Sequence, residues 1–172
     1  MMVIGDLPRR NAWRYPGEIA LVAGARRVTW RDLNDRVNAL AHGLAARGLR
    51  KGDRIAILST ATIEVIETYF AAAKLGLVIV PIHTGLVERE VEFMLSDVGA
   101  RAVVVEAQFC AQFAATIAAV RSIDLRVAIG DWAGFTSIAA LAAEAAEEPP
   151  RVTVDTDLFA IRFTSGTTGL PK

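Results

Sequence analysis

The feature that most constrains the fold is a set of short, uninterrupted apolar runs, each of which follows a helical segment and a glycine. The runs are Ile55–Leu58, Leu77–Ile82 and Ala102–Val105, and the glycines before them are Gly48, Gly76 and Gly99. A fourth run, Val127–Ile129, follows a predicted helix over residues 107–121. Strands with one buried face alternate apolar and polar residues, whereas strands buried on both faces are apolar throughout. The pattern therefore predicts an α/β fold with a mainly parallel sheet and helices on both of its faces.

Smaller elements are predicted before these runs. We expect a short helix over residues 6–15, closed by Pro16-Gly17. A hairpin should follow, with strands Ile19–Ala23 and Arg27–Trp30 around Gly24-Ala25. These elements would stand in front of the main α/β pattern.

Residues 31–47 are predicted to form an amphipathic helix. Thr29, with Asp32 three residues later, resembles a capping box, in which side chains satisfy the unpaired amides at a helix start. Four leucines and valines follow at helical spacing, namely Leu33, Val37, Leu40 and Leu44. The helix should bury this stripe and end at Gly48.

The last part of the chain predicts one more helix, a linker and a strand. Residues 136–147 are rich in alanine and predict a helix, whose end carries three glutamates that we expect to be solvated: Glu144, Glu147 and Glu148. Pro149-Pro150 indicates a linker into a strand over residues 157–163. We therefore divide the chain into an α/β subdomain, residues 1–150 with the helix and hairpin at 1–30, and a C-terminal part, 151–172.

Composition narrows the class of protein. The chain has 172 residues, of which 53% are hydrophobic, so it can bury a substantial core and is not disordered. Lys+Arg and Asp+Glu both number 19, and no basic excess points to nucleic acid. No signal peptide is apparent, and no uncharged apolar run approaches the roughly 18 residues of a membrane span. The single cysteine, Cys110, is expected to be a small buried residue of a cytoplasmic protein.

Thr164–Lys172 has the composition of a phosphate-binding loop. Gly166 and Gly169 allow successive backbone amides to point at an anion, and the hydroxyls between them add donors. Lys172 supplies a compact positive charge suited to phosphate oxygens. The loop is not a Walker A motif, because Pro171 precedes the lysine where that motif has glycine. A polar linker is the alternative interpretation, although linkers rarely follow an apolar strand.

Several segments, taken in order, resemble the adenylate-forming superfamily of acyl-CoA synthetases, peptide-synthetase adenylation domains and luciferases. Thr164–Lys172 is similar to the signature loop of that superfamily. Lys51–Leu58 resembles its "GDRVAI" strand, and Ala72–Ile82 resembles its "KLGAVVVPI" segment. The resemblance extends over almost the whole chain and is greatest to bacterial fatty-acyl-CoA ligases.

The resemblance implies an enzyme that converts a carboxylate, expected to be a fatty acid, and Mg-ATP into an acyl-adenylate and pyrophosphate. The acyl group would then pass to the thiol of coenzyme A. The phosphates of ATP would be bound by Thr164, Ser165, Gly166, Thr167, Thr168, Gly169 and Lys172. Thr164 would also help to hold Mg²⁺. The resemblance implies that the catalytic lysine and the acidic Mg²⁺ ligand follow the loop, so no catalytic residue is expected within this chain.

Three further expectations complete the prediction. The chain by itself should be inactive, residues 165–172 should be mobile, and the parent enzyme should be cytoplasmic, with peripheral membrane association left open. Two other interpretations also stay open. One is a non-enzymatic subdomain that self-associates into a homo-oligomer through exposed apolar surface. The other is an enzyme that activates amino acids or aryl acids.

Other polar and aromatic residues carry less information. His83 has no partner at the spacing of a catalytic triad or a metal site, so we expect it to have a structural role in its loop. Trp13, Trp30 and Trp132 are expected to pack in the core or beneath a lid.

Overall fold

Parallel strands form the centre of the molecule. The structure is a computed structural model that describes residues 2–143 and 147–164. Within these residues the main sheet has five strands in the order β4-β3-β5-β6-β7, and all the pairings between them are parallel. The strands are β3 (Arg54–Leu58), β4 (Val78–Ile82), β5 (Ala102–Glu106), β6 (Leu125–Ile129) and β7 (Thr136–Ser137). The parallel α/β sheet predicted from the apolar runs is confirmed.

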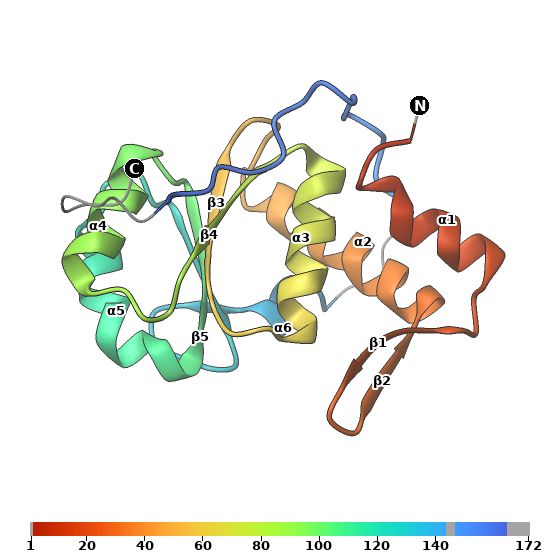
Figure 1. Ribbon diagram of the computed structural model, residues 1–172, viewed down its shortest axis with the longest axis horizontal. Helices are drawn as coiled ribbons and strands as arrows, with labels where there is room; N and C mark the ends of the chain where they lie inside the picture. Colours follow the sequence, from red (N-terminus) through yellow and green to blue (C-terminus); the bar gives the residue numbers. More distant parts are fainter. Residues whose placement is uncertain (1, 144–146, 165–172) are drawn as a thin grey trace.

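Helices cover both faces of this sheet (Figure 1). On one face lie α2 (Trp30–Ala46), α3 (Ile63–Leu75) and α6 (Ile138–Leu141), and on the other lie α4 (Glu88–Asp97) and α5 (Ala107–Ala119). Successive residues of β3 supply the two cores in turn. Ile55 and Ile57 belong to the first, and Ala56 and Leu58 belong to the second. Because neighbouring side chains on a strand point to opposite faces, an uninterrupted apolar run serves both cores.

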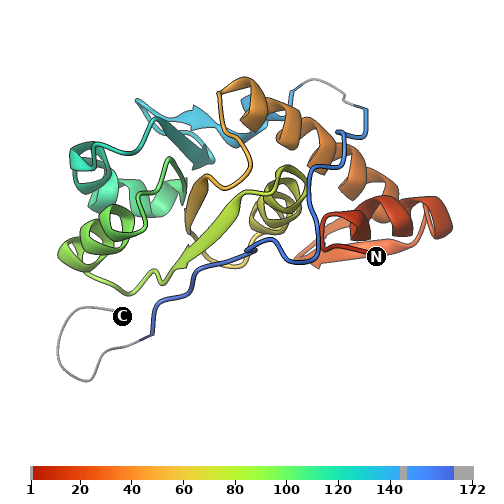
Figure 2. The same cartoon turned by 90° about the horizontal axis from the view of Figure 1, so that it is seen from above.

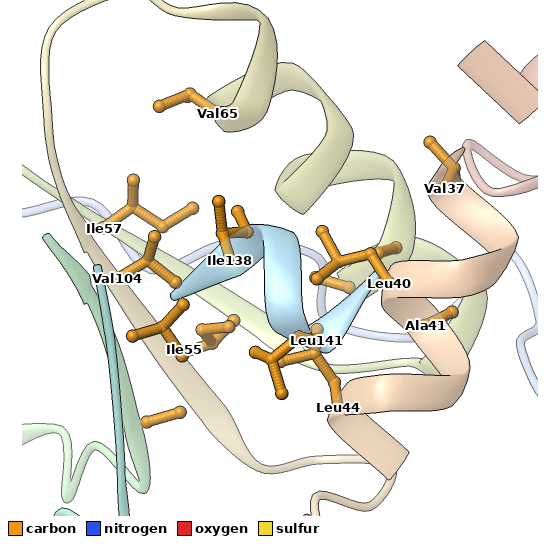
Figure 3. Close-up of a cluster of buried hydrophobic side chains, with 14 of the residues drawn as sticks. Val37, Leu40, Ala41, Leu44, Ile55, Ile57, Val65, Val104, Ile138 and Leu141 are labelled. Carbon is orange, nitrogen blue, oxygen red and sulfur yellow. The ribbon is translucent and has the colours of Figure 1, made fainter. Parts of the chain in front are cut away.

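Figure 3 shows the first core. Leu40 and Leu44 of α2 lie beside Leu141 of α6 and face Ile55 of β3. Leu40 is 2% exposed and Ile55 is completely buried. Since burial of one such side chain contributes about 1.5–3 kcal/mol, this contact is a main source of the stability that holds α2 to the sheet.

The N-terminal elements lie outside α2. Helix α1 (Asp6–Arg14) packs against α2, and β1 (Ile19–Ala23) pairs with β2 (Arg26–Thr29) in an antiparallel hairpin. The predicted cap is confirmed, because the Thr29 hydroxyl accepts a hydrogen bond of 3.2 Å from the amide of Asp32. The expected packing of Trp13 is wrong: this side chain is 83% exposed, since α1 faces solvent on its outer side.

The helix predicted over residues 136–147 is mostly wrong. Thr136 and Ser137 form β7 instead, paired with Val127 and Ala128 of β6. The Ser137 hydroxyl then caps α6, which ends at Leu141. Residues 144–146 lie outside the described part of the chain. Pairing at the edge of the sheet therefore delays the start of the helix to Ile138.

Contact between α6 and α2 explains a glycine within α2. A Cβ atom at Gly43 would lie only 2.0 Å from the carbonyl oxygen of Leu141. Glycine in a helix interior is unfavourable by about 1 kcal/mol relative to alanine, so its presence here reflects the close approach of the two backbones.

The strand predicted over residues 157–163 is reduced to one bridge. Residues 147–163 are called the connecting segment below; its last residues run alongside β4, and Ala160 forms an isolated parallel bridge with Ile79 (Figure 2). The Ile79 amide donates to Phe159 and its carbonyl accepts from Ile161, both at 2.9 Å. The next residue of β4 on this side is Pro81, which has no amide hydrogen. Pro81 therefore cannot donate the next hydrogen bond between β4 and the connecting segment. The prediction of a full strand over residues 157–163 did not take this proline into account.

The acidic residues around position 148 are also not a solvated helix end. Glu148 forms an ion pair of 2.6 Å with the buried Lys74, which lies in the last turn of α3. Glu147 is exposed, and its carbonyl oxygen lies 3.0 Å from Nε2 of His42. Glu144 lies outside the described residues.

Candidate functional site

The order of the strands defines one edge of the sheet as a place for a ligand. The chain passes from β3 to β4 on one side, and then crosses β3 to reach β5 on its other side. In open parallel sheets, ligands bind outside the carboxyl ends of the strands at the point where the order reverses. That point lies between the ends of β3 and β5.

The connecting segment brings Thr164 to the same edge. It runs parallel to β4, so the residues after its bridge at Ala160 approach the carboxyl end of that strand (Figure 2). Thr164 follows directly and is exposed. The structure thus places the first residue of the predicted phosphate loop at the carboxyl edge of the sheet, beside β4, which neighbours the strand pair where the order reverses.

Side chains anchor the segment just before Thr164. Phe159 and Ala160 pack against the core under α2 and α3, whereas Ile161 and Phe163 pack against the core under α4 and α5. The ring of Phe163 meets Phe93 of α4 edge to face, with centroids 6.5 Å apart and planes at 72°. Such aromatic pairs add to the stabilisation that burial provides. The position of Thr164 therefore rests on contacts with both cores.

The rest of the predicted loop cannot be compared with the structure. Its members lie outside the described residues: Ser165, Gly166, Thr167, Thr168, Gly169 and Lys172. Their roles in phosphate binding, and the predicted mobility of residues 165–172, stay predictions.

A polar cluster at the reversal point was missed by sequence reasoning. The Glu106 carboxylate, at the end of β5, accepts hydrogen bonds from the Thr60 amide at 2.9 Å and hydroxyl at 2.8 Å, and from the Ser59 hydroxyl at 3.0 Å. Gln108 donates to its other oxygen at 2.6 Å. Burial raises the pKa of Glu106, but these hydrogen bonds outweigh burial and lower the pKa below its ordinary value. The cluster joins the ends of β3 and β5, and two polar residues directly after an apolar run were the signal for it.

His83 lies in the loop after β4. Its Nδ1 atom accepts a hydrogen bond of 3.0 Å from the amide of Gly85. This bond closes a local turn, as expected of a loop residue. Among residues 2–143 and 147–164, no group of three or more His, Cys, Asp or Glu side chains could hold a metal ion.

Comparison with known proteins assigns the family. Residues 8–172 match the family of AMP-binding enzymes. The chain belongs to this family. It is 41% identical over 177 residues to the long-chain-fatty-acid–CoA ligase FadD13 of Mycobacterium tuberculosis, covering 100% of this chain and 34% of that protein. It is 35% identical over 170 residues to a feruloyl-CoA synthase of an Amycolatopsis species, covering 98% of this chain and 32% of that enzyme.

Two solved structures have the same fold. The inhibitor-bound N-terminal domain of FACL13 from Mycobacterium tuberculosis superposes with a TM-score of 0.89 at 35% identity, covering 100% of this chain and 43% of that one. The anthranilate CoA ligase AuaEII, in complex with anthranoyl-AMP, superposes with a TM-score of 0.90 at 25% identity, covering 99% of this chain and 33% of that one. The chain spans about a third of the length of its curated relatives. No helix within the described residues is long and apolar enough to cross a membrane.

Proposed function

We propose that this AMP-binding chain supplies the phosphate-binding loop of an ATP-dependent acid–CoA ligase. The observation that carries the proposal is the delivery of Thr164 to the carboxyl edge of a parallel sheet by the connecting segment. The residues that follow Thr164 combine glycines, hydroxyls and a lysine, which together suit a polyphosphate. The family match over residues 8–172 supports the same reaction class.

In this proposal the reaction has two steps. A carboxylate oxygen attacks the α-phosphorus of ATP, and the bond to the β,γ-pyrophosphate breaks, which gives an acyl-adenylate. The thiol of coenzyme A then displaces AMP to give the thioester. Positioning and charge neutralisation account for most of the catalysis in such phosphoryl chemistry.

The chain's own contribution is to hold the leaving pyrophosphate. Lys172 and the amides of Gly166–Gly169 stabilise negative charge on its oxygens as the bond breaks. Thr164 offers a hydroxyl oxygen, which is the type of ligand that Mg²⁺ prefers. Mg²⁺ would arrive with ATP and neutralise phosphate charge. We expect no acyl-CoA formation by the 172-residue chain alone, because the catalytic lysine is implied to lie outside it.

A fatty acid is the proposed substrate, because the 41% identical relative is a long-chain-fatty-acid–CoA ligase. An aryl acid is the alternative, since a feruloyl-CoA synthase is 35% identical. An amino acid is another, since a synthase of N-(5-amino-5-carboxypentanoyl)-L-cysteinyl-D-valine from Amycolatopsis lactamdurans is 36% identical over 165 residues, covering 94% of this chain and 4% of that protein. We propose a cytoplasmic enzyme, with peripheral membrane contact through its substrate as an extension.

ATP–pyrophosphate exchange tests the proposal on the full-length protein that carries this sequence. A panel of fatty, aryl and amino acids should give exchange with the fatty acids, and Lys172→Ala should reduce it. Arg26→Gln is the matched control, because Arg26 pairs on the surface with Glu64, away from the connecting segment. Absence of exchange with every acid, together with a self-associated species in size-exclusion chromatography, would favour the non-enzymatic alternative.

A further inference from the structure

A buried lysine joins the connecting segment to the helical layer. The side chain of Lys74 is 3% exposed. Its ammonium donates to Oδ1 of Asn34 at 2.9 Å, to Oδ1 of Asn38 at 2.6 Å and to the Glu148 carboxylate at 2.6 Å. An ammonium has three donors, so the three oxygens satisfy it completely. The second oxygen of Glu148 accepts from Nδ2 of Asn34 at 3.3 Å.

Stability alone does not account for this arrangement. Removal of an ammonium from water is costly, and well-packed apolar residues in place of a buried ion pair are often neutral or stabilising. The pKa of Lys74 agrees, because burial lowers it in spite of the attraction of Glu148. Asp6 and Arg9 of α1 also act on Lys74, with opposite signs. A role that buried ion pairs do fulfil is to fix one register of a chain among several.

The connecting segment is a part of the molecule whose register needs fixing. It has no helix or strand of its own, and its backbone meets β4 only at the Ile79 bridge. The packing of residues 159–163 on both cores holds its end, so its start needs a separate attachment. Two further ion pairs attach the segment to the folded body, and in each the basic side chain is exposed. Arg151 pairs with Asp6 at 3.7 Å, and Lys51 pairs with Asp157 at 2.7 Å. Exposed pairs contribute little to stability, so the pair that contains the buried Lys74 is the charged attachment that specifies where the segment begins.

We propose that Lys74 is a positioning residue for phosphate binding, because it fixes the start of the segment that brings Thr164 to the carboxyl edge of the sheet. Lys74 touches no reacting atom and acts through Glu148. The inference rests on the proposed function, since it assigns Lys74 to the same ATP site. Asn34 and Asn38 hold the ammonium in place, so α2 and α3 together set where the segment begins.

The expected effect is on ATP affinity. If loss of the pair leaves the segment correctly placed in only a tenth of the molecules, the apparent KM for ATP rises about tenfold. Saturating ATP selects those molecules, so the maximal exchange rate changes little. A general loss of fold would instead lower the maximal rate by reducing the amount of active protein.

Two variants and one control test the inference by ATP–pyrophosphate exchange in the full-length protein. Lys74→Met removes the charge from the buried side, and Glu148→Ala removes it from the partly exposed side, where misfolding is a smaller risk. Both should raise the KM for ATP about tenfold, with the maximal rate kept, whereas Arg26→Gln should change neither.

Hydrogen exchange in the full-length protein gives an independent readout. The amide of Ile161, which donates to Ile79, should exchange faster in both variants than in the wild type and in Arg26→Gln. If the wild type catalyses ATP–pyrophosphate exchange but both variants keep its KM for ATP and its hydrogen-exchange rate at Ile161, the role of Lys74 is overturned and the proposed function stands. If the wild type catalyses no ATP–pyrophosphate exchange, the proposed function is overturned, and the role of Lys74 in ATP binding with it.

Discussion

Gly43→Ala sets helix propensity against packing. Alanine is favoured over glycine in a helix interior by about 1 kcal/mol, so propensity alone predicts that the variant is more stable. The structure predicts the reverse. The new Cβ atom would lie 2.0 Å from the Leu141 carbonyl oxygen and 2.8 Å from its carbon, whereas ordinary contact begins at 3.4 Å. Because the obstacle is backbone, it cannot rotate away.

The size of the effect follows from this overlap. Helix α6 would have to retreat by about 1.4 Å, the difference between 3.4 and 2.0 Å, and it would take Ile138 and Leu141 partly out of the core. Overpacking of this kind typically costs about 1–3 kcal/mol. After the propensity gain is subtracted, we expect a net loss of up to about 2 kcal/mol.

Urea unfolding followed by circular dichroism measures this loss. Ala45→Gly is the matched control, because Ala45 is an exposed residue of the same helix. It should lose about 1 kcal/mol through propensity alone. A Gly43→Ala variant that is about 1 kcal/mol more stable than the wild type would refute the close approach of α6.

Three more predictions test other parts of the structure. Pro81→Val introduces an amide hydrogen that faces the connecting segment, so the hydrogen-bond ladder between β4 and this segment should extend. The amides of residues 161–163 should then exchange their hydrogens more slowly, and unchanged rates would contradict the assigned orientation of β4. The pKa of Lys74 is lower in the folded than in the unfolded chain, so stability should rise with pH between those two values, and subtraction of a Lys74→Met urea series should isolate this rise. The Cys110 thiol is buried, and burial also raises its pKa, so it should react with a thiol reagent only as fast as the protein unfolds. Rapid reaction of the native chain would show that the thiol is accessible.

The elements that sequence predicted well depend on residues close together in the chain. The apolar run at Ile55–Leu58 predicts a strand that is buried on both faces, and Thr29 with Asp32 predicts the start of a helix. Both signals are local, so their outcome does not depend on how the chain folds back on itself. The parallel sheet followed from such signals.

The elements that were missed depend on partners far apart in sequence. From the sequence alone, Glu148 is one of several glutamates predicted to be solvated; only the fold brings it beside Lys74 of α3. Residues 136–147 read as a helix until β6 is found next to Thr136. The cluster at Glu106 was missed for the same reason, because its hydrogen-bond donors Ser59 and Thr60 follow a different strand. Pro81 is the exception, since a proline in a predicted strand is visible in the sequence and should have limited the next strand to an edge contact.

The same proline has a consequence for the behaviour of the protein in a crowded cell. Exposed strand edges recruit strands from other chains, and proteins limit this risk with prolines and very short edge strands. On its outer side β4 presents Ile79, whose amide is already bonded, and Pro81, which has none to give. At the opposite edge, β7 spans only Thr136–Ser137. Neither described edge of this sheet therefore offers a long template for another strand, and we expect both edges to resist aggregation by strand addition.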